Sequence, residues 1–396
     1  MKILNPILIS VMLAAFAPAI VTKAYSVEIP TDISEKEKPA TIKVLIANGK
    51  DKALLEIKGR HLIYDPFTGY KISEGVLSKR SMIYPNESGL KWGERFPGIL
   101  QMRLVPGDSQ SSILVDGIEY KGCVEIYDMK GKLHIVNEVD IERYLKATLS
   151  SELQNEYDED VMDALAIVAR TNAYYLVSRQ PSANWHVEAP EEGFAGYAMT
   201  LQNAQVDRAI NNTKHMVLTY NNAPFATAWN KNSAGKTADF ASIFRKEVSV
   251  PPGVAAPYAE RERQKFGWTL SIAKPQLASM LGANKITALD LYQEKQSGKV
   301  YAVRLKDGAD TKNIDFFKLQ KVLGQKKLRS NDFTIKVQGD TIVFSGFGDG
   351  HGVGLCLFSA AAMADNGADT KKILSTFFPD TKLENIRSFQ ATSNRR

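Results

Sequence analysis

The stretch Ala164-Leu165-Ala166-Ile167-Val168-Ala169-Arg170 carries the clearest structural signal in this 396-residue chain. Its first six side chains are apolar on every side of a helix, which predicts a buried helix. We expect that helix to begin at Asp158 or Glu159 and to run to about Val177. Arg170 places a charge in its middle, and burying an unpaired guanidinium is costly. Arg170 therefore needs an acidic or carbonyl partner, lines a wet cleft, or extends its charged end to the surface.

A shorter helix precedes the buried one. Asp140 is a good N-cap, and the apolar residues after it recur at helical spacing. This helix should end near Ser150-Ser151-Glu152. Glu152 is thus a carboxylate at a helix end, either a solvated surface group or a candidate catalytic acid.

The rest of the chain predicts an α+β fold. Between residues 41 and 136, short β-type runs alternate with turn signals such as Asn48-Gly49 and Asp116-Gly117, which indicates a β-rich N-terminal part. Residues 137–390 form the expected core, with the two helices, a hairpin that turns at Asn221-Asn222, and short helices at the end.

A second informative stretch is Gly346-Phe347-Gly348-Asp349-Gly350-His351-Gly352-Val353-Gly354. It fits neither a dinucleotide-binding fingerprint nor a P-loop. Glycine at this density indicates backbone conformations closed to other residues, or a close approach by another group. The loop precedes an alanine-rich helix, so it presents His351 and backbone N–H groups where an oxyanion or a sugar hydroxyl can bind. A purely structural glycine turn is the alternative.

The chain begins with Lys2 and an almost uninterrupted apolar run over residues 3–21. A basic start, an apolar stretch and a small residue such as Ala24 predict a signal peptide over residues 1–24. An uncleaved anchor is the alternative, because the run nearly reaches the about 20 residues that span a bilayer. Charged residues 25–40 predict a linker. We expect an exported protein, in the periplasm or on the extracytoplasmic face of the membrane, with membrane contact only if the leader is retained.

Composition excludes several classes of site. With only two cysteines, the chain has no disulfide framework and no four-cysteine zinc site. The net charge of +6 is not gathered into Lys/Arg runs, so we expect no nucleic-acid partner. A candidate metal cluster fits no standard zinc spacing, and we expect no metal and no cofactor; its members are His186, Glu188, Glu191 and Glu192. Cys356 with His351 remains conceivable as a peptidase pair.

Five motifs follow one another in a specific order. They are Tyr144-Leu145, Ser150-Ser151-Glu152-Leu153, Ala164 to Tyr174, Asn232-Ser233-Ala234-Gly235, and Gly348 to Leu355. In this order the chain resembles the stage II sporulation protein D (SpoIID/LytB) family of exported lytic transglycosylases. Leu357 departs from the family, which often has a glutamine after the glycine loop.

The resemblance implies a cleft over the buried helix and a cell-wall activity. The family's reaction cleaves the β-1,4 bond between N-acetylmuramic acid and N-acetylglucosamine and leaves a 1,6-anhydro end. By resemblance, Glu152 is the single general acid and base. The residues expected to bind substrate are Arg170, Thr171, Ser233, Gly350, His351 and Gly352. The implied partners are peptidoglycan glycan strands and a peptidoglycan amidase. A non-catalytic glycan-binding module that localises or stimulates another wall hydrolase is the alternative.

Overall fold

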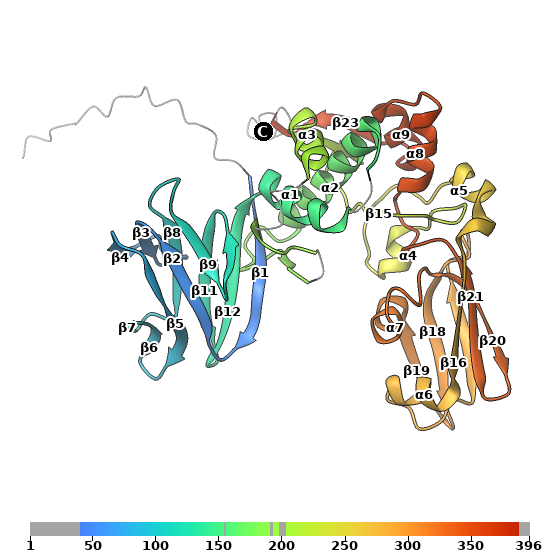
Figure 1. Cartoon of the computed structure of the whole chain (residues 1–396), viewed down its shortest axis with the longest axis horizontal. Coiled ribbons are helices and arrows are strands. Elements are labelled where there is room, and N and C mark those ends of the chain that lie inside the picture. Colours follow the sequence, from blue (N-terminus) through green and yellow to red (C-terminus); the bar gives the residue numbers. More distant parts are fainter. Residues whose placement is uncertain (1–39, 154–155, 191–192, 198–202, 388–396) are drawn as a thin grey trace, which may run out of the picture. The chain divides into compact units, whose positions relative to one another are not determined.

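The computed structural model describes residues 40–153, 156–190, 193–197 and 203–387 (Figure 1). The expected signal peptide over residues 1–24 and nearly all of the linker over 25–40 lie outside these residues. Within the described part of the chain, no helix is both long and apolar enough to cross a membrane.

Two sheets form the β-rich N-terminal part that the sequence predicts. One has the strand order β13-β1-β12-β11-β8-β3-β4, and the other β10-β9-β2-β5-β6-β7. The strands are β1 (Thr41–Lys50), β2 (Ala53–Lys58), β3 (His61–Tyr64), β4 (Lys71–Gly75), β5 (Lys79–Asn86), β6 (Gly89–Trp92), β7 (Glu94–Pro97), β8 (Gln101–Pro106), β9 (Ser112–Val115), β10 (Ile118–Tyr120), β11 (Cys123–Met129), β12 (Lys132–Asp140) and β13 (Val187–Glu188).

Buried and partly exposed side chains alternate along these strands, and the buried ones form the apolar core. In β2, the side chains of Ala53, Leu55 and Ile57 are buried while those between them are partly exposed, as expected for a strand with one buried face. Trp92 is fully buried, and its indole N–H donates to the Leu55 carbonyl at 3.0 Å. The expected boundary at residue 136 falls inside β12, which leads directly into the first helix.

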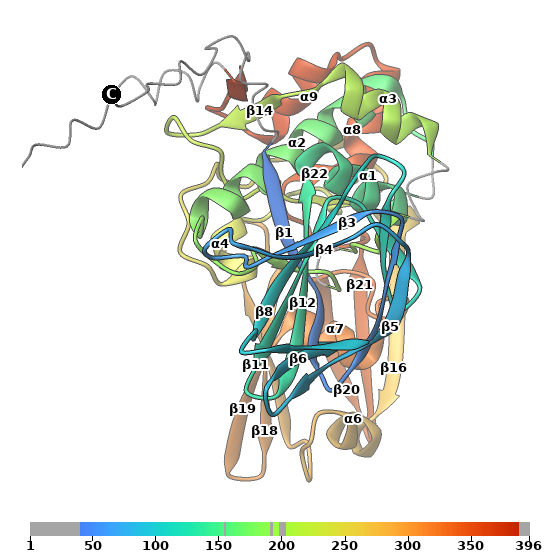
Figure 2. The ribbon, with the colours of Figure 1, turned by 90° about the vertical axis from the view of Figure 1, so that its left-hand side faces the viewer.

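Helices α1 (Ile141–Glu152) and α2 (Glu159–Arg179) confirm the two predicted helices. Asp140 caps α1 by accepting from the Arg143 N–H, and Asp158 caps α2 by accepting from the Asp160 N–H. Helix α2 contacts α1, α3 (Ala204–Asn212), α8 (Leu357–Asp365), α9 (Thr370–Phe377) and β14 (Met216–Thr219), as the views in Figures 1 and 2 show. Residues 164–168 are fully buried, because helices surround α2.

The acidic partner of Arg170 is Glu142, which lies in the same helical layer. Its Nε and one NH2 hydrogen bind the Glu142 carboxylate of α1 at 2.9 and 2.7 Å. The remaining N–H groups bind Thr213 Oγ1 and the carbonyls of Met216 and Ile210 at 3.1 to 3.2 Å. All five guanidinium donors are therefore used, and Arg170 ties α1, α3 and the start of β14 to α2.

The predicted hairpin is only partly present. Asn221 and Asn222 have φ values of 50° and 62°, as a tight turn requires. However, β14 pairs with the distant β23 (Lys382–Asn385), and β15 (Trp229–Asn230) pairs in parallel with β22 (Leu355–Cys356). The hairpin prediction was wrong beyond the turn, because pairing with the C-terminal segment replaces local pairing.

A second apolar core lies between residues 268 and 344. Two three-stranded sheets carry it, β16-β21-β20 and β17-β18-β19, together with helices α6 and α7. The remaining elements are α4 (Phe240–Phe244), α5 (Pro257–Arg261), the 3₁₀ helix η2 (Arg263–Phe266), β16 (Gly267–Ala273), α6 (Lys274–Met280), β17 (Ala288–Gln293), β18 (Val300–Asp307), β19 (Asp310–Asp315), α7 (Phe316–Leu323), β20 (Asp332–Gln338) and β21 (Thr341–Phe347).

Replacing Arg170 with methionine should destabilise the protein by about 3–5 kcal/mol, because Glu142 would keep its charge without a partner. Urea unfolding measures this change. Arg304→Met is the control, since Arg304 forms an exposed ion pair with Asp290 and its loss should matter far less. Equal midpoints for both variants would contradict the structural role of Arg170.

Candidate functional site

A cleft of about 780 Å³ opens at the C-terminal end of α1. Leu153, the residue after that helix, lines it, together with residues of β15, the glycine loop and α8. Glu152 is the last residue of α1, and its side chain lies outside the described residues. The backbone therefore brings the predicted catalytic position to the edge of the cleft.

Aromatic and polar side chains share the cleft wall. Tyr157, Trp229, Phe266 and Phe358 supply aromatic surface, and Phe266 packs edge-on against Phe358 with 4.8 Å between ring centres. The polar lining comes from Asn230, Lys231, Asn232, Gln325, Asp349 and His351. Flat apolar faces beside hydrogen-bonding groups match a sugar, which has C–H faces and hydroxyl edges.

The glycine loop is held on both sides by backbone hydrogen bonds. Asp349 and Asn232 exchange N–H···O bonds of 2.9 and 3.0 Å, and the Gly350 N–H donates to the Arg329 carbonyl at 2.9 Å. The Gly348 N–H donates to the Phe266 carbonyl. The expectation that this loop presents free N–H groups is therefore wrong for these three residues, whose N–H groups bind carbonyls of the protein.

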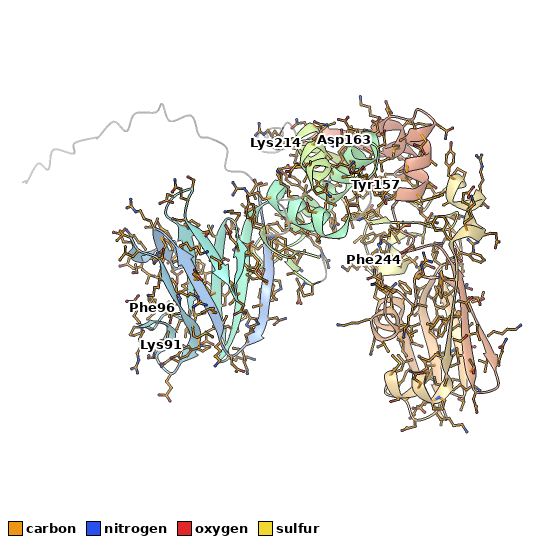
Figure 3. All side chains as sticks on the ribbon, viewed as in Figure 1. Lys91, Phe96, Tyr157, Asp163, Lys214 and Phe244 are labelled. Carbon is orange, nitrogen blue, oxygen red and sulfur yellow. The ribbon has the colours of Figure 1, made fainter. Side chains whose placement is uncertain are left out.

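His351 lines the cleft with a fixed tautomer. Its Nδ1 accepts from the Val353 N–H at 3.1 Å, so the neutral ring carries its proton on Nε2. Phe244 of α4, labelled in Figure 3, and Phe317 of α7 pack around the ring, with centres 5.1 and 6.3 Å away. Burial lowers the pKa of His351 to about 4. At neutral pH the side chain is thus an uncharged hydrogen-bond donor.

Arg170 and Thr171 do not reach the cleft. Every donor of the buried Arg170 is bound within the protein. The Thr171 hydroxyl donates to the Ile167 carbonyl and accepts from the Leu218 N–H. The structure thus departs from the expectation that these two residues bind substrate, because their polar groups stabilise the contact between α2 and its neighbours.

Ser233 and Gly352 are both buried. Ser233 is 1% exposed, and its N–H donates to Cys356 Sγ at 3.4 Å. The Gly352 carbonyl accepts from the Ala238 N–H. Neither residue lines the cleft, so of the six expected substrate-binding residues only Gly350 and His351 do.

The pairing of Cys356 with His351 as a peptidase site lacks the necessary geometry. Cys356 is fully buried, and its sulfur faces the Ser233 N–H, while the Nδ1 of His351 faces Val353. The structure therefore does not pair Cys356 and His351 as nucleophile and base.

The candidate metal cluster is described only in part. His186 Nδ1 accepts from the Lys43 N–H. Glu191 and Glu192 lie outside the described residues, and the described part of the chain contains no cluster of three or more possible metal ligands.

Sequence reasoning missed several residues of the cleft wall. Trp229 and Lys231 precede the small polar loop at Asn232, and Tyr157 follows α1. An aromatic residue and a lysine directly before a loop of small residues were the available signal. Asp349 belongs to the glycine loop that the sequence analysis singled out, but it was not named as a binding residue. It forms an ion pair with Arg329 at 3.3 Å.

The titration of His351 should follow its aromatic surroundings. The imidazole should titrate near pH 4 in the histidine NMR spectrum, well below its ordinary value of 6.5. Because folding lowers the pKa of His351, protonation of this side chain favours the unfolded chain. The free energy of unfolding is therefore unaffected by His351 above pH 6.5 and decreases as the pH falls toward 4. His351→Gln should remove this part of the pH dependence of unfolding. A midpoint near 6.5 would contradict the packing by Phe244 and Phe317.

Comparison with known proteins agrees with the motifs. A family model described as SpoIID, stage II sporulation protein, matches residues 129–220, which include α1, α2 and β14. The chain is 35% identical over 179 residues to an uncharacterised protein of Chlamydia pneumoniae, covering 45% of this chain and 65% of that protein. The match therefore spans just under two thirds of that relative's length.

Two relatives from Bacillus subtilis carry descriptive names. Stage II sporulation protein D is 23% identical over 275 residues, which cover 64% of this chain and 77% of that protein. A protein called amidase enhancer is 23% identical over 292 residues, covering 60% of this chain and 40% of that protein. The family model therefore assigns residues 129–220 to the stage II sporulation protein D (SpoIID) family, and the named relative is similar over a longer part of the chain.

Proposed function

We propose that this protein is an exported lytic transglycosylase that cleaves peptidoglycan glycan strands. One observation carries the proposal: helix α1 ends at Glu152, directly beside a cleft whose wall combines aromatic rings with hydrogen-bonding groups. A glycan strand is a long chain of rings, each with apolar faces and polar edges. The wall offers both kinds of contact, and Leu153, the residue that follows the candidate acid, is part of it.

A single carboxylate is sufficient for this reaction. Glu152 donates a proton to the glycosidic oxygen as the bond from C1 of N-acetylmuramic acid breaks, which releases N-acetylglucosamine with a free 4-hydroxyl. The C6 hydroxyl of the same muramic acid residue then attacks C1, and Glu152 takes its proton. The product is a 1,6-anhydro ring, and no water is consumed. Hydrolytic glycosidases, in contrast, generally use two carboxylates.

The neutral His351 assists by binding rather than by acid catalysis. Its Nε2–H is a donor at neutral pH, suited to a hydroxyl or carbonyl oxygen of the sugar. A charged imidazolium in the same place would favour the ionised form of a nearby carboxyl, whereas the general acid must begin protonated. An uncharged ring avoids that conflict.

Glu152→Gln should abolish release of anhydro-muropeptides from purified cell-wall sacculi, because an amide cannot transfer the proton. Glu156→Gln is the matched control, since Glu156 is an exposed carboxylate four residues further along. Mass spectrometry of the soluble products measures both. Full activity of Glu152→Gln would remove Glu152 from the mechanism, and equal loss in both variants would point to a general defect.

A glycan-binding module without turnover is the second candidate. The similarity to a protein called amidase enhancer favours it, as does Leu357, which lines the cleft where the family often has glutamine. Under this hypothesis the purified protein releases no anhydro ends, yet it binds glycan and accelerates a peptidoglycan amidase. The sacculus digestion, repeated with an amidase present, separates the two functions.

A further inference from the structure

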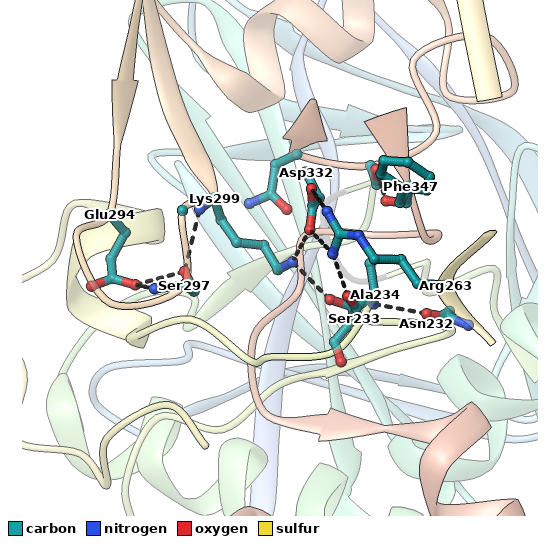
Figure 4. Close-up of polar contacts among 12 residues, drawn as sticks. Asn232, Ser233, Ala234, Arg263, Glu294, Ser297, Lys299, Asp332 and Phe347 are labelled. Atoms are coloured by element: carbon teal, nitrogen blue, oxygen red, sulfur yellow. Dashed lines mark hydrogen bonds and ion pairs between the residues drawn. The ribbon is translucent and has the colours of Figure 1, made fainter. Parts of the chain in front are cut away.

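Lys299 lies immediately before β18 and is 1% exposed. Burying an ammonium group costs free energy unless the protein pairs it closely. Figure 4 shows how this one is paired: its Nζ donates to the Ser233 carbonyl at 2.7 Å and to Asp332 Oδ2 at 2.9 Å. The Ser233 carbonyl belongs to the loop whose neighbouring residue, Asn232, lines the cleft.

A second cation completes the same arrangement. Arg263 binds both oxygens of Asp332 at 2.8 and 3.0 Å, and it also donates to the Ala234 carbonyl. Two cations that share one carboxylate therefore hold the carbonyls of two consecutive residues. Ala234 has a φ of 55°, a conformation that is unfavourable for a residue with a side chain. The cluster holds the loop in that conformation.

The stem of Lys299 also supports the glycine loop. A side-chain carbon at Gly352 would collide with Cε and Cδ of Lys299, so the two residues are in close contact. Next to Lys299 in space, Asn331 donates to the His351 carbonyl at 2.9 Å. One lysine thus touches the loop of Ser233 with its charged end and the loop of His351 with its methylene groups.

We propose that Lys299 is a positioning residue that fixes the two loops of the cleft relative to each other. It does not line the cleft, so it acts through Asn232 on one side and His351 on the other. Its effect on glycan turnover rests on the function proposed above, whereas its effect on the two loops does not.

The first test uses Lys299→Met, which keeps the stem and removes the charge, while Asp332 remains paired with Arg263. Amide hydrogen exchange should become at least tenfold faster in residues 232–238 and 348–353. Lys43→Met is the matched control, because Lys43 pairs with the buried Glu125 within the N-terminal sheets. That control should leave exchange in both loops unchanged.

Arg263→Met adds a second comparison and remains informative if Lys299→Met fails to fold. Arg263 contacts the carbonyl of Ala234 and the ring of Phe347, whereas the atoms nearest to a side-chain carbon at Gly352 belong to Lys299 and Asn331. Exchange should therefore accelerate at 232–238 and much less at 348–353. Loops that exchange as slowly in Lys299→Met as in Lys43→Met, or equal acceleration of both loops in Arg263→Met, would overturn the proposal.

Chemical rescue separates positioning from general loosening. Lys299→Ala should lose at least tenfold in kcat/KM on peptide-stripped glycan, and added propylammonium should restore much of it because it replaces the missing side-chain atoms. The neutral 1-propanol should not. Equal rescue by both compounds would contradict a role for the ammonium group. If the natural chain shows no turnover, the proposed function fails, and the exchange measurements still decide the role of Lys299.

Discussion

The ion pair between Arg170 of α2 and Glu142 of α1 sets how these two helices pack against each other. A guanidinium cannot lose its charge in a protein, so a buried arginine must be matched by acceptors on every side. Here those acceptors come from α1, α3, Thr213 and Met216. Their convergence fixes the direction of α1, and therefore where Glu152 at its end is placed.

The cleft depends on a different kind of constraint. Its two loops have little regular secondary structure, so backbone pairing alone cannot set their geometry. Backbone hydrogen bonds join them between Asn232 and Asp349 and between Ala238 and Gly352, and the side chains of Lys299, Arg263 and Asn331 add further contacts. Regular elements thereby hold irregular loops that contain the binding groups, which is common in proteins.

Local patterns in the sequence predicted the features that depend on neighbouring residues. The caps at Asp140 and Asp158, the buried centre of α2 and the turn at Asn221 each follow from a few neighbouring residues, and the structure confirms them. Pairing of β14 with β23 joins residues more than 160 positions apart, which no local pattern encodes. For the same reason a partner for Arg170 could be expected but Glu142 could not be identified, and the family resemblance assigned the buried Thr171 and Ser233 to substrate binding.

The proposed function requires the end of α1 to bring a catalytic acid into a glycan-binding cleft. A crystal structure of Glu152→Gln with a bound peptidoglycan oligosaccharide tests it most directly. We expect sugar rings against Trp229 and Tyr157, a contact with Nε2 of His351, and the amide of residue 152 within hydrogen-bond distance of a glycosidic oxygen. Sugar bound on another surface, or residue 152 turned toward bulk solvent with the cleft occupied, would contradict it.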